Sequence, residues 1–183
     1  MKGKKRQEWI EQGYQVAATE GFSSLSIESI SRAINKNKSS FYHYFGDWDG
    51  FEDALLAYHL ELSREFAREA NQCQNIIPDM LDLFVAHETD IFFHKQLRIN
   101  RKKPQYKQCF EEVYSMYEEA ILNRWTHYLQ LDDQPLLARK ILNLVSENFL
   151  LQITPANFNA EWMKNYLADI THLLVAMGKP AKK

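Results

Sequence analysis

The fold of this chain is decided by residues 26–45, which read SIESISRAINKNKSSFYHYF. The spacing of apolar residues predicts two short helices in this stretch, over residues 27–34 and 38–44, separated by a polar turn. Ser26 and Asn37 each precede one of these helices, and their side chains are suited to accept hydrogen bonds from its first free amides. The stretch therefore predicts the two helices and the turn of a helix-turn-helix.

A longer helix is expected on each side of this stretch. The helix before it covers residues 5–20 and ends at Gly21, a residue type that commonly terminates helices. After it, Gly46 breaks the chain and a helix capped by Asp47 runs to about residue 71. Within the turn, Asn35 tolerates a positive φ angle and can reverse the chain.

The rest of the chain repeats the same helical spacing, and no segment alternates in the manner of a strand. Further helices are expected over residues 78–100, 104–131, 134–153 and 159–177, the first of them broken near His87. Six glycines and five prolines are too few for the turns of an all-β protein. We predict an all-α fold of about nine helices, with a helix-turn-helix domain over residues 1–46 and a larger helical domain over residues 47–183.

The charge is divided unevenly along the chain. Residues 1–45 hold seven basic and four acidic residues, a net charge of +3, whereas the other 138 residues hold 15 basic and 20 acidic residues, a net charge of −5. A basic N-terminal third on an acidic body suggests an anionic partner at one end.

Several classes of protein are excluded by composition. The two cysteines, Cys73 and Cys109, form no CxxC pair, so neither a disulfide framework nor a zinc ribbon is expected. No apolar run is long enough for a membrane span, and the opening residues lack the apolar core of a signal peptide. We expect a cytoplasmic protein with no metal, no cofactor and no membrane partner.

A set of residues stands at fixed offsets in this part of the chain: Gly21-Phe22, Ser26-Ile27, Ile30, Ala33 and the run from Lys38 to Phe45. With them, residues from 5 to about 60 resemble the N-terminal domain of the TetR family of bacterial transcriptional regulators. The Tyr42-His43-Tyr44-Phe45 ending looks like the hallmark of that family. The resemblance implies a DNA-binding helix-turn-helix, a homodimer, and a small effector held in the C-terminal domain.

The chain departs from the family pattern at five positions. Asn35 stands where glycine is usual, Lys36 where a small apolar residue is usual, and Ser39 where glycine is common. Ser29 replaces an acidic residue that would complete a capping box, and Trp48 replaces a lysine that often touches a phosphate. The change at residue 48 removes one expected contact with DNA.

The candidate DNA-binding residues are Lys38, Ser39, Ser40, Tyr42, His43, Tyr44, Ser26, Lys4, Lys5 and Arg6. A recognition helix enters the major groove with its N-terminal residues, where Lys38 can reach guanine. The resemblance implies that hydroxyl groups such as those of Ser40 and Tyr42 hold phosphates. Taken singly, the tyrosines could be core residues and Lys38 a solvated charge, and His43 could meet a base, a phosphate or solvent. Lys4–Arg6 could be a disordered tail that serves only solubility.

The last two expected helices carry apolar stripes wider than one core face would bury, which suggests a partner surface. The candidate dimer residues are Leu137, Ile141, Leu144, Asn148, Met163, Leu167, Ile170 and Leu174. In the resembled family the last two helices form a homodimeric four-helix bundle. The alternative is that these stripes are intramolecular core.

The candidate effector-binding residues are Phe84, His87, Tyr114, Tyr117, Trp125 and Phe149. A pocket rich in aromatic side chains would favour a lipophilic ligand, although the same residues could be ordinary core. A basic cluster at Arg98, Arg101, Lys102 and Lys103 is predicted to be a solvated loop.

Two other functional classes are alternatives for a helical chain of this kind. A helical-bundle enzyme with a di-metal centre needs Glu-x-x-His pairs, and no glutamate here has a histidine three residues later. The sequence His87-Glu88-Thr89-Asp90-Ile91 lacks the second histidine of a zinc protease motif. A helical interaction protein that keeps the helix-turn-helix without operator binding is the nearer alternative. We predict no enzyme, but a repressor that binds a palindromic operator as a dimer and is released by a small effector.

Overall fold

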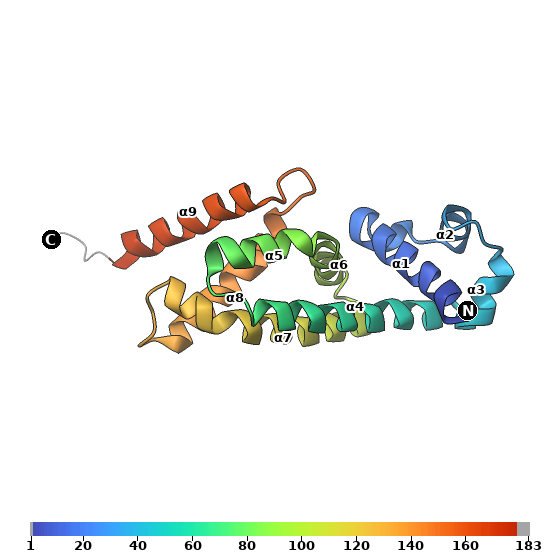
Figure 1. Ribbon diagram of the computed structural model, residues 1–183, viewed down its shortest axis with the longest axis horizontal. Coiled ribbons are helices and arrows are strands. Elements are labelled where there is room, and N and C mark those ends of the chain that lie inside the picture. Colours follow the sequence, from blue (N-terminus) through green and yellow to red (C-terminus); the bar gives the residue numbers. More distant parts are fainter. Residues whose placement is uncertain (1, 179–183) are drawn as a thin grey trace. The chain divides into compact units, whose positions relative to one another are not determined.

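The computed structural model describes residues 2–178, which form nine α-helices and no strand (Figure 1). This confirms the predicted all-α fold. The helices are α1 (Lys2–Glu20), α2 (Ile27–Ala33), α3 (Lys38–Phe45), α4 (Trp48–Ala70), α5 (Leu81–Ala86), α6 (Glu88–Ile99), α7 (Pro104–Tyr128), α8 (Pro135–Gln152) and α9 (Ala160–Gly178). The predicted break near His87 separates α5 from α6.

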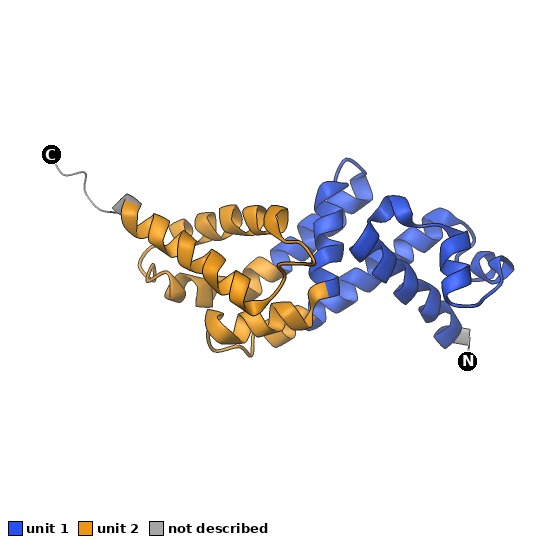
Figure 2. Ribbon diagram, turned by 90° about the horizontal axis from the view of Figure 1, so that it is seen from above, with its two compact units in different colours: residues 1–65, 89–116 blue, residues 66–88, 117–183 orange. Residues whose placement is uncertain are grey.

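The chain divides into two compact units, which are coloured separately in Figure 2. Unit 1 comprises Met1–Glu65 and Thr89–Met116, and unit 2 comprises Phe66–Glu88 and Tyr117–Lys183. The long helices α4 and α7 each contribute residues to both units. The predicted boundary after residue 46 is a functional one, and it falls within unit 1.

Local hydrogen bonds set the starts of three helices in unit 1. The side chains of Ser26, Asn37 and Asp47 each accept a hydrogen bond from the amide three residues later, at 3.0, 3.0 and 2.8 Å. Asn35 turns the chain between α2 and α3 with a φ of 51°. All four roles were predicted from the sequence, because capping depends on residues close along the chain.

An aromatic cluster fixes which face of α3 points inward. Phe41 is fully buried, with ring centroids 5.4 Å from Trp9 of α1 and 5.2 Å from Phe51 of α4. Trp48 stacks on Phe41 at 6.2 Å and donates its indole N–H to Glu52 at 3.1 Å. The tryptophan that replaces the lysine usual in the resembled family thus has a structural role in this chain.

Glu52 is a nearly buried carboxylate that ties α4 to the start of α7. It accepts a hydrogen bond of 2.7 Å from the Tyr106 hydroxyl and forms an ion pair with Lys103. Burial opposes ionisation of Glu52, but these contacts and the Trp48 hydrogen bond outweigh that effect and lower its pKa. Lys103, in the basic loop that was predicted to be solvated, thus pairs with a nearly buried carboxylate while its own side chain stays 38% exposed.

A buried polar chain joins α1, α4 and α6 within unit 1. The Tyr14 hydroxyl donates to Asp90 Oδ1 at 3.0 Å and lies 2.7 Å from His59 Nδ1. His59 Nε2 lies 3.4 Å from His94 Nδ1, and neither histidine is more than 2% exposed. Since Tyr14 gives its proton to Asp90, it accepts from His59 Nδ1–H, and His59 Nε2 then accepts from His94.

Acidification should destabilise the protein at pH values above those at which its carboxylates become protonated. Burial lowers the pKa of both histidines, to about 3 for His94, whereas a histidine in the unfolded chain has a pKa of about 6.5. Below pH 6.5 the unfolded chain therefore binds more protons, and stability falls as the pH drops from 6.5 toward 3. We expect the free energy of unfolding to fall between pH 7 and pH 5, by about 2 kcal/mol through His94 and by a further amount through His59, as measured by urea denaturation. The His94→Gln variant should lose the part of this pH dependence that His94 contributes, and an equal stability at the two pH values would contradict the assignment.

The start of α4 should tolerate no side chain at Gly50. A Cβ atom there would lie 2.2 Å from the backbone oxygen of Phe45, whereas a Cβ at Gly3 would meet nothing within 4 Å. We expect Gly50→Ala to lower the free energy of unfolding by about 1–3 kcal/mol in thermal denaturation, although alanine is the better helix former. Gly3→Ala is the matched control and should be neutral or slightly stabilising. Equal effects of the two changes would show that the backbone contact is unimportant.

Candidate nucleic-acid interface

The outward face of α3 carries most of the predicted recognition residues. Ser39 and His43 are exposed and Tyr42 is 55% exposed, whereas Phe41 between them points into the core. Ser40 and Tyr44 are half-buried on another side of the helix. The aromatic cluster therefore sorts one short helix into a buried face and a polar, accessible face.

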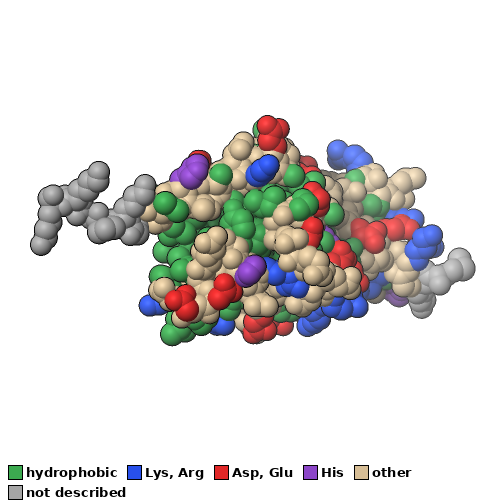
Figure 3. All heavy atoms as spheres, turned by 60° about the vertical axis from the view of Figure 1, so that its left-hand side comes forward, with side chains coloured by type: hydrophobic (Ala, Val, Ile, Leu, Met, Phe, Trp, Pro, Cys, Tyr) green, Lys and Arg blue, Asp and Glu red, His purple; other side chains and the backbone are tan. Residues whose placement is uncertain are grey.

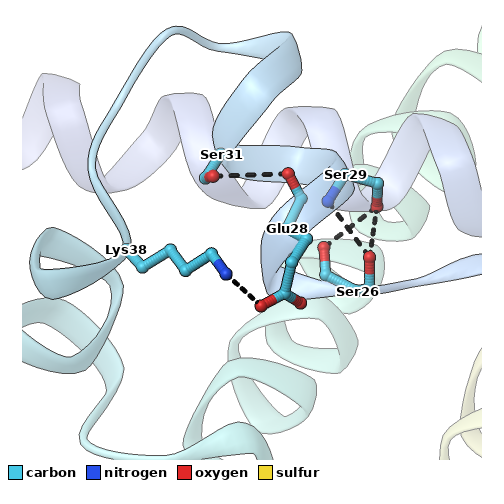
Figure 4. A network of polar contacts seen from close by, with 5 residues as sticks. All are labelled: Ser26, Glu28, Ser29, Ser31 and Lys38. Carbon is cyan, nitrogen blue, oxygen red and sulfur yellow. Dashed lines mark hydrogen bonds and ion pairs between the residues drawn. The ribbon is translucent and has the colours of Figure 1, made fainter.

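Lys38, the predicted base reader, is held by an acidic residue of α2. Figure 4 shows its ammonium group directed at the carboxylate of Glu28, with which it forms an ion pair. Both side chains remain more than half exposed. The hydrogen bond from Lys38 is the main cause of a lowered pKa for Glu28. Lys38 can therefore reach another acceptor only by exchanging or sharing this partner.

The N-terminus of α2 is capped by two serines. Ser26 Oγ donates to Ser29 Oγ at 2.8 Å, and Ser29 Oγ donates to the Ser26 carbonyl at 3.0 Å (Figure 4). Ser29 thus supplies a reciprocal contact where a capping box would use an acid. Both hydroxyls are engaged within the cap, so Ser26 would have to redirect its proton to donate to a phosphate.

The predicted basic tail belongs to a helix. Lys4, Lys5 and Arg6 lie in α1, which begins at Lys2, and all three side chains are exposed. The guanidinium carbon of Arg6 lies 5.2 Å from the centroid of the Phe45 ring, a cation–π contact with α3. Because the helix continues to Lys2, these charges are carried by α1 instead of a disordered tail, and Arg6 among them lies against α3.

A polar cleft of about 240 Å³ lies between α1 and the α2–α3 turn. It brings together three predicted DNA-binding residues, Lys5, Ser40 and Tyr44. The remaining lining residues are Trp9, Asn35, Lys36 and Asn37. Sequence reasoning did not assign Lys36 to the DNA-binding set, although a basic residue in place of a small apolar one was a usable signal.

Unit 2 contains a small apolar cavity of about 80 Å³. Of the predicted effector residues, Phe84, Trp125 and Phe149 line it. His87, Tyr114 and Tyr117 are not among its lining residues. The other lining residues, which sequence reasoning did not assign to a pocket, are Ile76, Met80, Leu81, Ile121, Leu142, Val145, Ser146, Met163, Tyr166 and Leu167.

The three predicted pocket residues outside the cavity have other contacts. His87 lies 3.4 Å from Glu69 and edge-on to Phe66. Tyr117 packs against the same phenylalanine, with 4.5 Å between ring centroids. Tyr114 belongs to unit 1. His87 and Tyr114 are half-buried and Tyr117 is buried, and the sequence pattern could not say which cavity, if any, each would face.

Hydrophobic side chains gather on the face of unit 2 seen in Figure 3. On α8, Leu144 is 73% exposed and Leu137 is 43% exposed. Ile141, Ile170 and Leu174 are half-buried, and Asn148 is exposed and accepts a hydrogen bond from the Tyr166 hydroxyl. Met163 and Leu167 instead lie inside unit 2 and line its cavity. Leu151 and Leu173, outside the predicted set, are also exposed.

Two further classes of site are absent from the described residues. No helix within residues 2–178 is both long enough and apolar enough to cross a membrane. In the same part of the chain, no three histidine, cysteine or acidic side chains converge in a way that could hold a metal ion.

Comparison with known proteins assigns no family. No protein-family model matches the chain, and no curated protein matches it. The class that the structure itself defines is an all-α protein with two short N-terminal helices joined by a tight turn. The resemblance to the TetR family therefore stays a prediction from the sequence.

Proposed function

We propose that the protein is a DNA-binding transcriptional regulator similar to those of the TetR family. The observation that carries this proposal is the outward face of α3, where Ser39, Tyr42 and His43 are accessible while Phe41 anchors the helix. Short helices presented in this way can enter the major groove of DNA. The net charge of +3 over residues 1–45 favours an anionic partner.

Within this proposal the contacts divide by chemistry. Lys38 reads a base edge after exchanging its Glu28 partner, because a lysine can donate to guanine O6 and N7. Tyr42 and Tyr44 donate to phosphates, as do Lys4, Lys5 and Arg6 from α1. Phosphate contacts set the position of the protein on the duplex, and base contacts supply the sequence preference.

The proposed regulator acts as a homodimer through α8 and α9. Leu144 and Leu151 on α8, and Leu173 on α9, are each more than half exposed in the single chain. A second copy would cover these leucines, and a two-fold axis would present two α3 helices to half-sites about 34 Å apart. An inverted-repeat operator follows from this symmetry.

An effector of unit 2 would be small and lipophilic. The cavity between Phe84, Trp125 and Phe149 has only about 80 Å³, whereas sites for drug-sized ligands usually have about 300–1,000 Å³. A larger ligand must therefore enlarge the cavity, which lies against α8 and α9. Binding would then favour one of two conformations of the dimer and release the operator. We therefore propose a repressor, and we place it in the cytoplasm, where its operator DNA would lie.

A helical interaction protein is the second candidate. Its support is that the most N-terminal charge of α3, Lys38, is already paired with Glu28, and that Trp48 belongs to the aromatic cluster instead of offering a charge. A protein of this kind would keep the helices without binding an operator.

Selection from a random pool of duplex DNA at moderate salt tests the proposed function. We expect an inverted repeat to be enriched by the wild-type protein. Lys38→Ala should flatten the sequence preference, since it removes a base contact, and Tyr42→Phe should weaken binding to all sequences alike. Absence of enrichment with a folded wild-type dimer would favour the interaction protein, and an equal loss of preference in both variants would overturn the division of roles.

Sedimentation of the purified protein tests the dimer. We expect Leu144→Glu to shift the wild-type dimer to a monomer at micromolar concentration, because it places a charge on the apolar face. Ile99→Glu is the matched control, since Ile99 of α6 is 57% exposed but lies outside that face. A monomeric wild type, or equal dissociation of both variants, would contradict the proposed interface.

A further inference from the structure

We propose that the polar cleft between α1 and the α2–α3 turn is a phosphate-binding site in which Lys5 and Lys36 hold the anion. The phosphate is either part of the DNA backbone or part of a free phosphate compound. The first of these sources rests on the proposed function, and the second does not.

The walls of the cleft suit an anion. The residues that line it include two lysines, a tyrosine and two asparagines, and none of them is acidic. The cleft has about 240 Å³, which is room for a phosphate group together with ordered water. Lys5 enters from the exposed side of α1, so an incoming ligand can reach it. Ammonium groups are strong donors to phosphate oxygens.

Lys36 is held at the cleft by a residue of α1. Its ammonium group lies 3.2 Å from Glu8 Oε2, and both side chains are about one-third exposed. Glu8 is not among the lining residues of the cleft. A lysine ammonium has three N–H donors, so one ion pair leaves others for a ligand. Glu8 therefore orients Lys36 and, by its charge, also weakens the attraction of the cleft for an anion.

Trp9 places a hydrogen-bond donor without an acceptor beside the cleft, and this observation is independent of the lysines. It lines the cleft and is fully buried, and its indole nitrogen has no hydrogen-bond partner. Buried N–H groups are nearly always paired, because an unpaired one loses its hydration without compensation. The nitrogen itself is buried in the wall of the cleft, so a bound anion can accept from it only after a small shift of the wall, and the indole N–H is a reporter of binding.

The other polar groups of the cleft have distinct tasks. Asn37 and Ser40 form two hydrogen bonds with each other: Asn37 Oδ1 accepts from the Ser40 backbone amide, and Ser40 Oγ donates to the Asn37 backbone carbonyl. These hydrogen bonds hold one wall of the cleft in place. Tyr44 and Asn35 complete the polar lining of the cleft, and the positive φ of Asn35 turns the chain around it.

The first test uses inorganic phosphate as the probe and does not depend on DNA. The indole N–H signals of the four tryptophans are followed by NMR during a phosphate titration, with sodium chloride at equal ionic strength as the reference, and Trp9→Phe assigns the signal. We expect a saturable shift of the Trp9 signal. Lys36→Gln should weaken phosphate binding about tenfold, and Glu8→Gln should strengthen it severalfold. Lys102→Gln, which removes an exposed charge from the loop before α7, should leave it unchanged.

The second test uses duplex DNA and the same variants, with circular dichroism to confirm that each is folded. If the DNA backbone supplies the phosphate, Lys36→Gln should remove one phosphate contact per protomer. The slope of log affinity against log salt should then become less steep by about one per protomer, whereas Lys102→Gln should leave it unchanged. A phosphate shift that depends on Lys36, with DNA affinity unchanged, would assign the site to a free phosphate compound.

The proposal is overturned if the Trp9 signal responds equally to phosphate and chloride, or if Lys36→Gln, Glu8→Gln and Lys102→Gln behave alike. If the wild-type protein binds no DNA, the proposed function as a regulator is rejected. The phosphate titration still tests whether the cleft binds phosphate.

Discussion

The arrangement of the N-terminal helices depends on the burial of one side chain, Phe41. Its ring meets Trp9 of α1 and Phe51 of α4, so a helix of only eight residues is fixed in rotation by contacts with two longer ones. Short helices have little stability of their own, and tertiary packing must supply it. Once Phe41 is inside, Ser39, Tyr42 and His43 are turned outward by the geometry of the helix. The accessible face of α3 is thus a consequence of its core.

Polar groups buried behind this cluster add constraints that apolar packing alone would not give. The carboxylate of Glu52 is satisfied only while Tyr106 and Lys103 of the α6–α7 region stay beside α4. Tyr14, His59, His94 and Asp90 impose a similar requirement on α1, α4 and α6. Separating either set would leave polar groups buried without partners, which is costly. Changes in α6 or in the first half of α7 can therefore affect the helix that carries Trp9.

Much of the fold could be predicted from the sequence because its determinants are local. The caps at Ser26, Asn37 and Asp47 depend on residues three apart, and the helices follow from apolar spacing. The pairs Lys38–Glu28, Lys36–Glu8 and Lys103–Glu52 could not be predicted, because each joins different elements and a solvated charge gives the same pattern. Periodicity likewise marks Leu144 and Met163 equally as apolar, although the first is exposed and the second is inside unit 2. A pattern identifies an apolar face but does not name the surface that covers it.

We propose that DNA binds to the outward face of α3 and to the helix ends beside it. Amide hydrogen exchange of the wild-type protein, with and without excess duplex DNA at low salt, tests this proposal. We expect slower exchange in DNA across residues 26–29 and 35–44, with the cavity-lining residues of unit 2 unchanged. Protection confined to unit 2, or no protection anywhere in α3 at saturating DNA, would contradict it.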